Sequence, residues 1–204
     1  MTGYGNRARR RERGERRPPM PLDQRRLEEL ALTYVARFAT SSGKLTAYLA
    51  RKLRERGWAE DAGPPPDLAA LAARYAEIGY LDDAAYARSK GEGLLRRGYG
   101  ARRVDQALIG AGIGETLRAE VAPDEAARRS AVVALARRRR FGPFGPFGEL
   151  ANDPARRDKQ LAAMLRAGHG FADARHVLDA PSAKALDEWV GEGAEDGPQR
   201  GEWD

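Results

Sequence analysis

Three glycines recur along the chain at almost the same interval, and each follows a large apolar residue by four positions. Gly57, Gly112 and Gly168 are 55 and 56 residues apart, and the apolar residues are Leu53, Leu108 and Met164. This pattern is typical of a helix that ends in a left-handed turn. The recurrence predicts stacked helical units that cover one another's cores and form a long molecule rather than a sphere. Coincidental spacing of ordinary helices is the alternative.

Apolar residues follow the period of an α-helix along most of the chain. The clearest stripe consists of Leu27, Leu30, Ala31, Tyr34, Val35 and Phe38. This spacing places all of them on one face of a helix. Runs of alternating apolar and polar residues are not convincing anywhere, and the abundant alanine and arginine favour helix. We expect an all-α fold.

Turn and cap residues divide this helical pattern into segments. The expected helix starts are at Asp67, at Asp82 or Asp83, and at Asn152-Asp153-Pro154. The expected stops are at Gly57, Gly63 to Pro66, Gly79, Gly98-Tyr99-Gly100, Gly112 and Gly168. Aspartate caps exposed N–H groups at a helix start, and glycine and proline end helices.

The net charge of +6 is distributed unevenly. Residues 1–26 hold nine arginines against three acids, whereas residues 187–204 hold seven acids against one arginine. Such charge runs favour solvated segments without a core. We therefore expect a disordered basic tail at 1–26 and an acidic tail at 191–204. Alternatively, the basic tail adds attraction to a polyanion.

The 204-residue chain has no cysteine, which excludes disulfide bonds and thiolate zinc sites. No apolar run approaches the roughly 18 residues that span a bilayer. The N-terminus also lacks the apolar segment of a signal peptide. We expect a cytoplasmic protein that has no membrane partner.

Residue sets that would carry catalysis are incomplete. His169 and His176 are the only histidines, and two imidazoles fall short of the three or four ligands of a transition-metal site. Asp82 and Asp83 are adjacent at a helix start, where side chains diverge, whereas an acid–base pair must converge. Gly91-Glu92-Gly93 lacks the lysine and hydroxyl residue of a phosphate loop. The sequence therefore predicts a binding protein with no catalytic residue, no metal and no cofactor.

Basic residues surround the turn at Gly98-Tyr99-Gly100 and form the best candidate binding surface. They are Arg88, Lys90, Arg96, Arg97, Arg102 and Arg103. Guanidinium groups pair with phosphates and carboxylates, so this cluster predicts a partner that carries either group. A solvated helical face is the alternative explanation.

A second basic run precedes a segment rich in phenylalanine, glycine and proline. Arg137, Arg138, Arg139 and Arg140 end a helix that starts near Asp124, and the sequence continues from Phe141 to Gly148. Proline removes a backbone donor and glycine loosens the chain, so this segment is expected to be a loop. Its rings either pack on neighbouring helices or, with the arginines, contact a nucleic acid or a partner protein.

Residues 79–113 carry a family resemblance. They contain Gly-Tyr-Leu-Asp-Asp-x-x-Tyr-Ala and then Arg-Gly-Tyr-Gly-x-x-x-Val-x-x-x-Leu-x-x-x-Gly-Ile. This pattern is similar to that of the RecX family of bacterial recombination regulators. The likeness extends more loosely from Ala31 to about Leu178, which is roughly three quarters of the chain.

The resemblance implies three tandem three-helix units in an elongated, curved molecule, at residues 27–79, 80–122 and 123–190. It also implies binding to the RecA recombinase filament on single-stranded DNA, with inhibition of ATP hydrolysis, strand exchange and coprotease activity. We expect a monomer that is not an enzyme. A sequence-independent DNA-binding helical protein without a recombinase partner is the alternative.

The resemblance also suggests roles for single positions. The structural motif consists of Gly79, Tyr80, Leu81, Asp82, Asp83, Tyr86, Gly98 and Gly100. Within it, the two aspartates are carried over as helix caps, and Tyr80, Leu81 and Tyr86 as packing residues. Arg97, Arg102 and Arg103 are carried over as candidate contacts with the partner.

Overall fold

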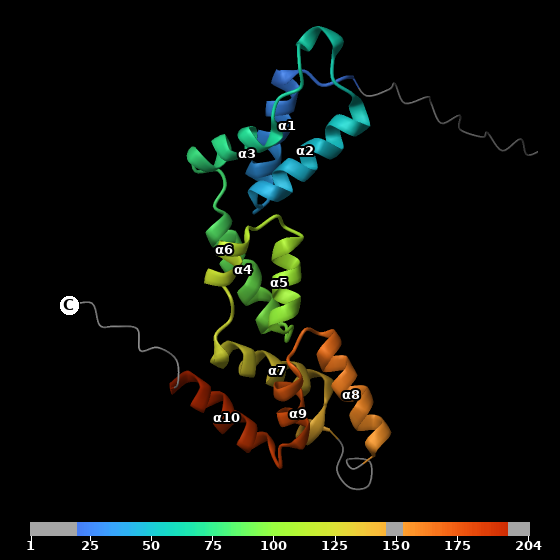
Figure 1. Cartoon of the computed structure of the whole chain (residues 1–204), viewed down its shortest axis with the longest axis vertical. Helices are drawn as coiled ribbons and strands as arrows, with labels where there is room; N and C mark the ends of the chain where they lie inside the picture. Colours follow the sequence, from blue (N-terminus) through green and yellow to red (C-terminus); the bar gives the residue numbers. More distant parts are fainter. Residues whose placement is uncertain (1–19, 146–152, 196–204) are drawn as a thin grey trace, which may run out of the picture.

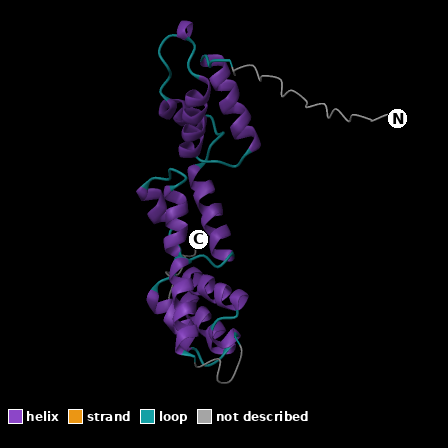
Figure 2. Cartoon of the chain, turned by 90° about the vertical axis from the view of Figure 1, so that its right-hand side faces the viewer, coloured by secondary structure: helices purple, strands orange, loops and turns teal. Residues whose placement is uncertain are grey.

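The computed structural model describes residues 20–145 and 153–195. In these two ranges the chain forms ten α-helices and two short 3₁₀-helices (Figures 1 and 2). Their one extended pairing is an isolated bridge between Leu22 and Trp58. The expected all-α fold is confirmed. Residues 1–19, 146–152 and 196–204, which include most of both expected tails and the end of the Phe-Gly-Pro segment, lie outside the described residues.

The first group of helices consists of α1 (Gln24–Arg37), α2 (Ser42–Arg56) and α3 (Leu68–Glu77), with the 3₁₀-helix η1 at Glu60–Ala62. Leu27, Leu45 and Leu49 are fully buried where their apolar faces meet. Leu22 joins this core, and its N–H donates a hydrogen bond to the carbonyl of Gly57. Packed structure therefore begins before the expected boundary at residue 26, because an apolar residue upstream of α1 completes the core.

The second group consists of α4 (Asp83–Arg96), α5 (Ala101–Ile109) and the short α6 (Glu115–Glu120). Ala87, Leu94, Val104 and Leu108 are buried between these helices. Gly91 is buried in the middle of α4, and a Cβ there would lie 3.5 Å from a methyl group of Val104. Small residues on α4 thus let α5 approach closely.

The third group consists of α7 (Glu125–Arg139), η2 (Gly142–Phe144), α8 (Pro154–Arg166), α9 (Phe171–Asp179) and α10 (Ala183–Glu195). It contains four α-helices, where the resemblance implies three. Val132, Met164, Val177 and Leu186 are fully buried in its core. α10 continues beyond residue 190, where the acidic tail was expected to begin, because Leu186 anchors its first turns in the core.

The three groups follow one another along the longest axis of the molecule, and the view turned by 90° shows the same order (Figures 1 and 2). Each group has its own cluster of buried side chains. A chain whose core is divided in this way exposes more surface than a chain of the same number of residues folded around a single core. The elongated shape agrees with the long molecule that the glycine recurrence predicts.

The first and second groups meet at a joint between the start of α2 and the turn after α5. Ser41 caps α2 and is fully buried, and its hydroxyl donates a hydrogen bond to the carbonyl of Ala111 at 2.6 Å. Gly43 lies against Gly112 at the same place. Glycines on both sides allow the backbones to touch.

The second and third groups meet at a joint of the same kind, between the start of α5 and the turn after α8. The N–H of Gly100 donates to the carbonyl of Ala167 at 2.9 Å, and the N–H of Arg102 donates to the carbonyl of Gly168 at 3.2 Å. Gly98 packs against the backbone of Leu135 in α7. Both joints therefore place an Ala-Gly pair that follows one helix against the start of another.

The predicted helix ends are confirmed at several positions. Asp67, Asp82 and Asp153 each accept a hydrogen bond from an N–H in the first turn of the helix that they precede. The expected helix-ending glycines have positive φ angles; they are Gly57, Gly79, Gly98, Gly112 and Gly168. These conformations follow from local chemistry and need no tertiary contact.

Candidate functional site

The two aspartates at the start of α4 act on different helices. A carboxylate oxygen of Asp82 accepts a hydrogen bond from the N–H of Ala85 at 2.7 Å and caps α4. The carboxylate of Asp83 accepts a hydrogen bond from the N–H of Ser42 at 2.8 Å. It therefore stabilises the start of α2, in the neighbouring group, where a negative charge suits the helix dipole. The two carboxylates serve separate backbone groups and do not form an acid–base pair.

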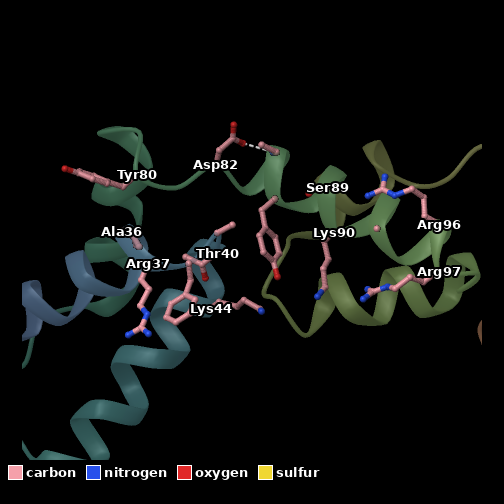
Figure 3. Close-up of a pocket in the computed structure, with 16 residues that line it drawn as sticks. Ala36, Arg37, Thr40, Lys44, Tyr80, Asp82, Ser89, Lys90, Arg96 and Arg97 are labelled. Atoms are coloured by element: carbon pink, nitrogen blue, oxygen red, sulfur yellow. Dashed lines mark hydrogen bonds between the residues drawn. The ribbon is translucent and has the colours of Figure 1, made fainter.

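A hollow of about 940 Å³ lies between the end of α1, the turn into α2 and one face of α4 (Figure 3). Its lining includes Arg37, Phe38, Thr40, Lys44, Tyr80, Asp82, Tyr86, Lys90, Arg96 and Arg97. We refer to this surface as the joint groove. Because it spans the first joint, it combines basic residues of two helix groups that are far apart in the sequence.

Three cations follow one another along the joint groove. In Figure 3 the charged ends of Lys44, Lys90 and Arg97 form a row, and Arg96, which also lines the hollow, lies apart from this row. None of the three takes part in an ion pair among the described residues, while Arg96 lies 3.5 Å from Glu92. The row therefore carries positive charge that no carboxylate of the described chain neutralises, and it attracts anions.

Aromatic rings lie beside the cations of the groove. The ammonium of Lys44 is 5.6 Å from the centre of the Tyr86 ring, and the guanidinium of Arg37 is 5.5 Å from that of Phe38. Each such contact contributes about 0.5–1 kcal/mol at an exposed site. The rings thereby hold two of the cations at the wall of the groove.

The three motif residues for which packing was expected differ in their burial. Leu81 is buried in the core of the first group, and Tyr86 is half-buried against the core of the second. Tyr80 is 53 % exposed. It lines the groove, and its ring contacts Tyr75 only in a tilted pair with centroids 5.8 Å apart. Tyr80 is therefore mainly a surface residue of the groove.

The rest of the predicted basic cluster divides between different faces. Arg103 lines a smaller hollow of about 340 Å³ together with Lys90 and Arg97, so this hollow continues the groove along α4. Arg102 lines a different hollow, between α5 and α6. Arg88 is exposed, and it is rotated by about 200° from Lys90 around the helix. The structure thus brings together only part of the cluster.

Sequence reasoning missed three residues that bring charge or an exposed ring to the joint groove. Arg37 and Phe38 end α1, and Lys44 lies in the first turn of α2. Their only local signal is that they flank the break between two helices. That break faces α4 because Ser42 is bound to Asp83, a contact over 41 residues that no local pattern indicates.

The second basic run lies in the third group of helices. Arg137 pairs with Asp187 of α10 at 2.9 Å, and its guanidinium lies 5.0 Å from the centre of the Phe144 ring. Arg138, Arg139 and Arg140 are exposed. Phe141 and Phe144 pack against the core of the third group. The geometry of these two rings supports the packing alternative, and Phe147 lies outside the described residues.

The two histidines have separate surroundings. His169 is 3 % exposed and donates a hydrogen bond from Nε2 to the carbonyl of Gly98 at 3.0 Å. Burial lowers the pKa of His169, although this hydrogen bond and the charge of Asp173 act in the opposite direction. His176 stacks on Trp189 with ring centroids 4.2 Å apart. His169 therefore belongs to the second joint, and His176 to the contact between α9 and α10.

Residues 20–145 and 153–195 contain neither a cluster of metal-ligating side chains nor a helix suited to a membrane. Over these ranges, no three side chains of the metal-ligating types gather at one point. No helix there combines the length and the apolar character that crossing a bilayer requires. The joint groove and its continuation along α4 are thus the candidate site for which the described residues give the strongest chemical argument.

The relatives found by comparison with known proteins share one description. The chain is 32 % identical over 187 residues to the regulatory protein RecX of Myxococcus xanthus, an alignment that covers 84 % of this chain and 94 % of the relative. It is also 32 % identical over 159 residues to the regulatory protein RecX of Thermus thermophilus, covering 78 % of this chain and 89 % of that protein. No protein-family model matches the chain.

Proposed function

Because the chain belongs to the RecX family of regulatory proteins, we propose that it binds the RecA filament on single-stranded DNA and inhibits the recombinase. The affected activities are ATP hydrolysis, strand exchange and coprotease activity. The observation that carries this proposal is the joint groove, in which Lys44, Lys90 and Arg97 have no carboxylate partner among the described residues. A regulator of a nucleoprotein filament must meet both acidic side chains and phosphates, and this row of cations suits either.

The elongated arrangement supports the same proposal. Three helix groups in a row present a long surface to a partner that is itself a filament, and stacked helical units commonly use such surfaces for binding. Arg138, Arg139 and Arg140 add exposed positive charge in the third helix group. The protein would act by occupying the filament as a cytoplasmic monomer, without a reaction of its own.

The test is a titration of the purified chain into RecA assembled on single-stranded DNA. We expect ATP hydrolysis and strand exchange to fall at amounts of the chain below those of RecA. An equimolar excess that leaves both activities unchanged would contradict the proposal. A matched control uses RecA without DNA, so that an effect on free RecA is separated from an effect on the filament.

A sequence-independent DNA-binding protein without a recombinase partner is the second candidate. The uncompensated cations of the groove favour it, since contacts to phosphates require no sequence information. Association with DNA would then fall steeply with salt and would not depend on RecA. A pull-down of RecA with and without DNA, at low and moderate salt, distinguishes the two candidates.

A further inference from the structure

We infer that the joint groove binds single-stranded DNA, with phosphates along Lys44, Lys90 and Arg97 and bases against the aromatic rings beside them. A strand in this position deepens the proposed function, because it places the chain on the DNA that a RecA filament carries. All of the residues that form this site belong to the chain itself, however, so we expect it to bind DNA without RecA as well.

The charge distribution fits a phosphate backbone. Among the described residues that line the groove, Asp82 is the only acid, and its carboxylate is engaged at the N–H of Ala85. Lys44 and Lys90 are half-buried, so their aliphatic stems are packed while the ammonium groups reach the groove. Cations that are already positioned lose less freedom when they bind a ligand. The cations of the groove are therefore positioned to bind an anion, and no carboxylate that lines the groove is available to neutralise them.

The aromatic residues fit unpaired bases. Phe38 is 51 % exposed and Tyr80 is 53 % exposed, although both are large apolar rings. Exposed apolar groups that are rimmed by polar residues mark binding surfaces. Bases of any sequence stack on such rings, and a positively charged groove with interleaved aromatic residues is the usual arrangement in proteins that bind single strands. In a duplex the base faces are covered by their neighbours, so the rings favour a single strand.

The wall of the groove contains a buried hydroxyl group. Thr40 is 7 % exposed, and its Oγ1 has no hydrogen-bond partner among the described residues. Buried polar atoms are almost always paired in native proteins. Because this oxygen is shielded from solvent, the strand is not expected to contact it. Thr40 immediately precedes Ser41, whose hydroxyl is used in the first joint, so the wall is held in place.

The path for the strand continues beyond the joint groove. The smaller hollow shares Lys90 and Arg97 with the groove and adds Tyr99 and Arg103. It again combines a ring with cations. α4 has 14 residues and therefore spans about 21 Å. The strand would run along this helix from the end of α1 toward the second joint.

An acidic protein segment is a different occupant that the cations alone would accept. The exposed rings of Phe38 and Tyr80 distinguish the two, because carboxylates gain little from an aromatic face, whereas bases stack on it. The rings therefore favour nucleic acid, and an acidic partner becomes an outcome of the experiment.

The experiment measures binding of the full chain to a fluorescent oligothymidylate by anisotropy, without RecA and at several salt concentrations. We expect Lys44→Glu and Arg97→Glu each to weaken binding by about tenfold and to reduce the slope of log K against log salt by about one. Arg88→Glu makes the same change of charge on the opposite side of α4. The general field of the protein changes as much as in the other two variants. Arg88 does not line the groove, so the affinity of Arg88→Glu is expected to stay within about twofold of the wild type.

Phe38→Ala separates stacking from charge. This variant is expected to lose about fivefold in affinity while its salt dependence stays that of the wild type, because no cation is removed. Circular dichroism and thermal unfolding of every variant identify any loss of fold. Phe38 is half-exposed at the end of α1, so its truncation should leave the helices intact.

Oligothymidylate binding by Lys44→Glu and Arg97→Glu that equals the wild type would overturn the DNA site. If these variants have at the same time lost binding to RecA, the occupant of the groove is an acidic protein surface. If the wild type binds DNA through the groove but leaves RecA ATP hydrolysis unchanged, the DNA site stands and the proposed function fails.

Discussion

Gly43, in the first turn of α2, and Gly112, after the end of α5, lie backbone against backbone at the first joint. A Cβ at Gly43 would lie 2.6 Å from the Cα of Gly112, which is closer than real Cβ atoms approach. Gly100 and Gly168 form the same kind of contact at the second joint. A glycine near the start of one helix and a glycine that ends another thus join successive groups, and a side chain at either position would force the groups apart.

Gly43→Ala is therefore expected to destabilise the protein by about 1–3 kcal/mol, the usual range for an overpacked site. Gly43 does not have a positive φ angle, so alanine adds no backbone strain. The measured loss is the steric cost minus the gain in helix propensity that alanine brings in α2. Urea unfolding followed by circular dichroism measures it. We also expect weaker binding at the joint groove, because the groove is formed by the two groups that this joint holds together.

Gly191→Ala is the matched control for this substitution. Gly191 lies within α10, and a Cβ there would meet no heavy atom within 4 Å. Alanine in a helix interior is expected to stabilise by up to about 1 kcal/mol relative to glycine. If Gly43→Ala were as stable as the wild type, the two backbones could not be as close as described.

His169 predicts a dependence of stability on pH. Its pKa is lowered from 6.5 in the folded protein, chiefly by burial. Below the unfolded pKa, the unfolded chain therefore takes up a proton that the folded chain does not. The free energy of unfolding falls as the pH drops from about 6.5 toward the folded pKa and stops falling below it, since both states are then protonated. At neutral pH this histidine imposes no such penalty.

The measurement compares thermal midpoints of the wild type and His169→Gln between about pH 7.5 and about pH 5. The glutamine amide keeps a donor for the carbonyl of Gly98 but does not titrate in this range. The wild type is expected to lose more stability on acidification than the variant. His176 is present in both proteins, so its contribution cancels. Equal losses in the two proteins would show that His169 is already free to protonate in the folded state.

The helix boundaries could be predicted from the sequence because they depend on local chemistry. Asp67 and Asp153 cap helices through contacts to residues two or three positions away. Gly57 and Gly168 adopt positive φ angles at helix ends, where glycine meets no steric penalty. The similar intervals between Gly57, Gly112 and Gly168 also indicated an elongated molecule, because they showed helical segments of similar length in succession.

The joints and the groove could not be predicted, because they depend on contacts between distant residues. Asp83 is placed as well as Asp82 to cap α4 by its position in the sequence, yet it accepts a hydrogen bond from Ser42 of another group. Only the packing of α4 against the start of α2 makes Lys44 a neighbour of Lys90. The fourth helix of the third group, α10, was likewise not separated from the acidic tail.

Substitution of the two aspartates distinguishes their roles. Asp82→Ala and Asp83→Ala are each expected to destabilise the protein by about 1 kcal/mol, since each removes an acceptor from a helix N-terminus. Only Asp83→Ala should accelerate hydrogen exchange at the N–H of Ser42, because that amide is its partner. Asp82→Ala should instead accelerate exchange at the N–H of Ala85. Exchange measured by nuclear magnetic resonance tests both, and faster exchange at the same amides in both variants would contradict the division of roles.

Arg102 and Arg103 are neighbours in the sequence but are expected to differ in function. Adjacent side chains in an α-helix are rotated by about 100°. Arg103 consequently lines the hollow that it shares with Lys90 and Arg97, whereas Arg102 lines the hollow between α5 and α6. Both side chains are exposed, so reversing either charge should leave the fold intact.

Arg103→Glu is therefore expected to weaken association with RecA filaments on single-stranded DNA by about tenfold, and Arg102→Glu by less than about twofold. Because the two variants have the same net charge, nonspecific electrostatics cannot produce the difference. Co-sedimentation of each variant with filaments gives the affinity. A reversal of Arg97 together with Arg103 should lose nearly as much as a reversal that also includes Arg102. Equal losses for Arg102→Glu and Arg103→Glu would mean that filament binding responds to overall charge rather than to the row of cations along α4.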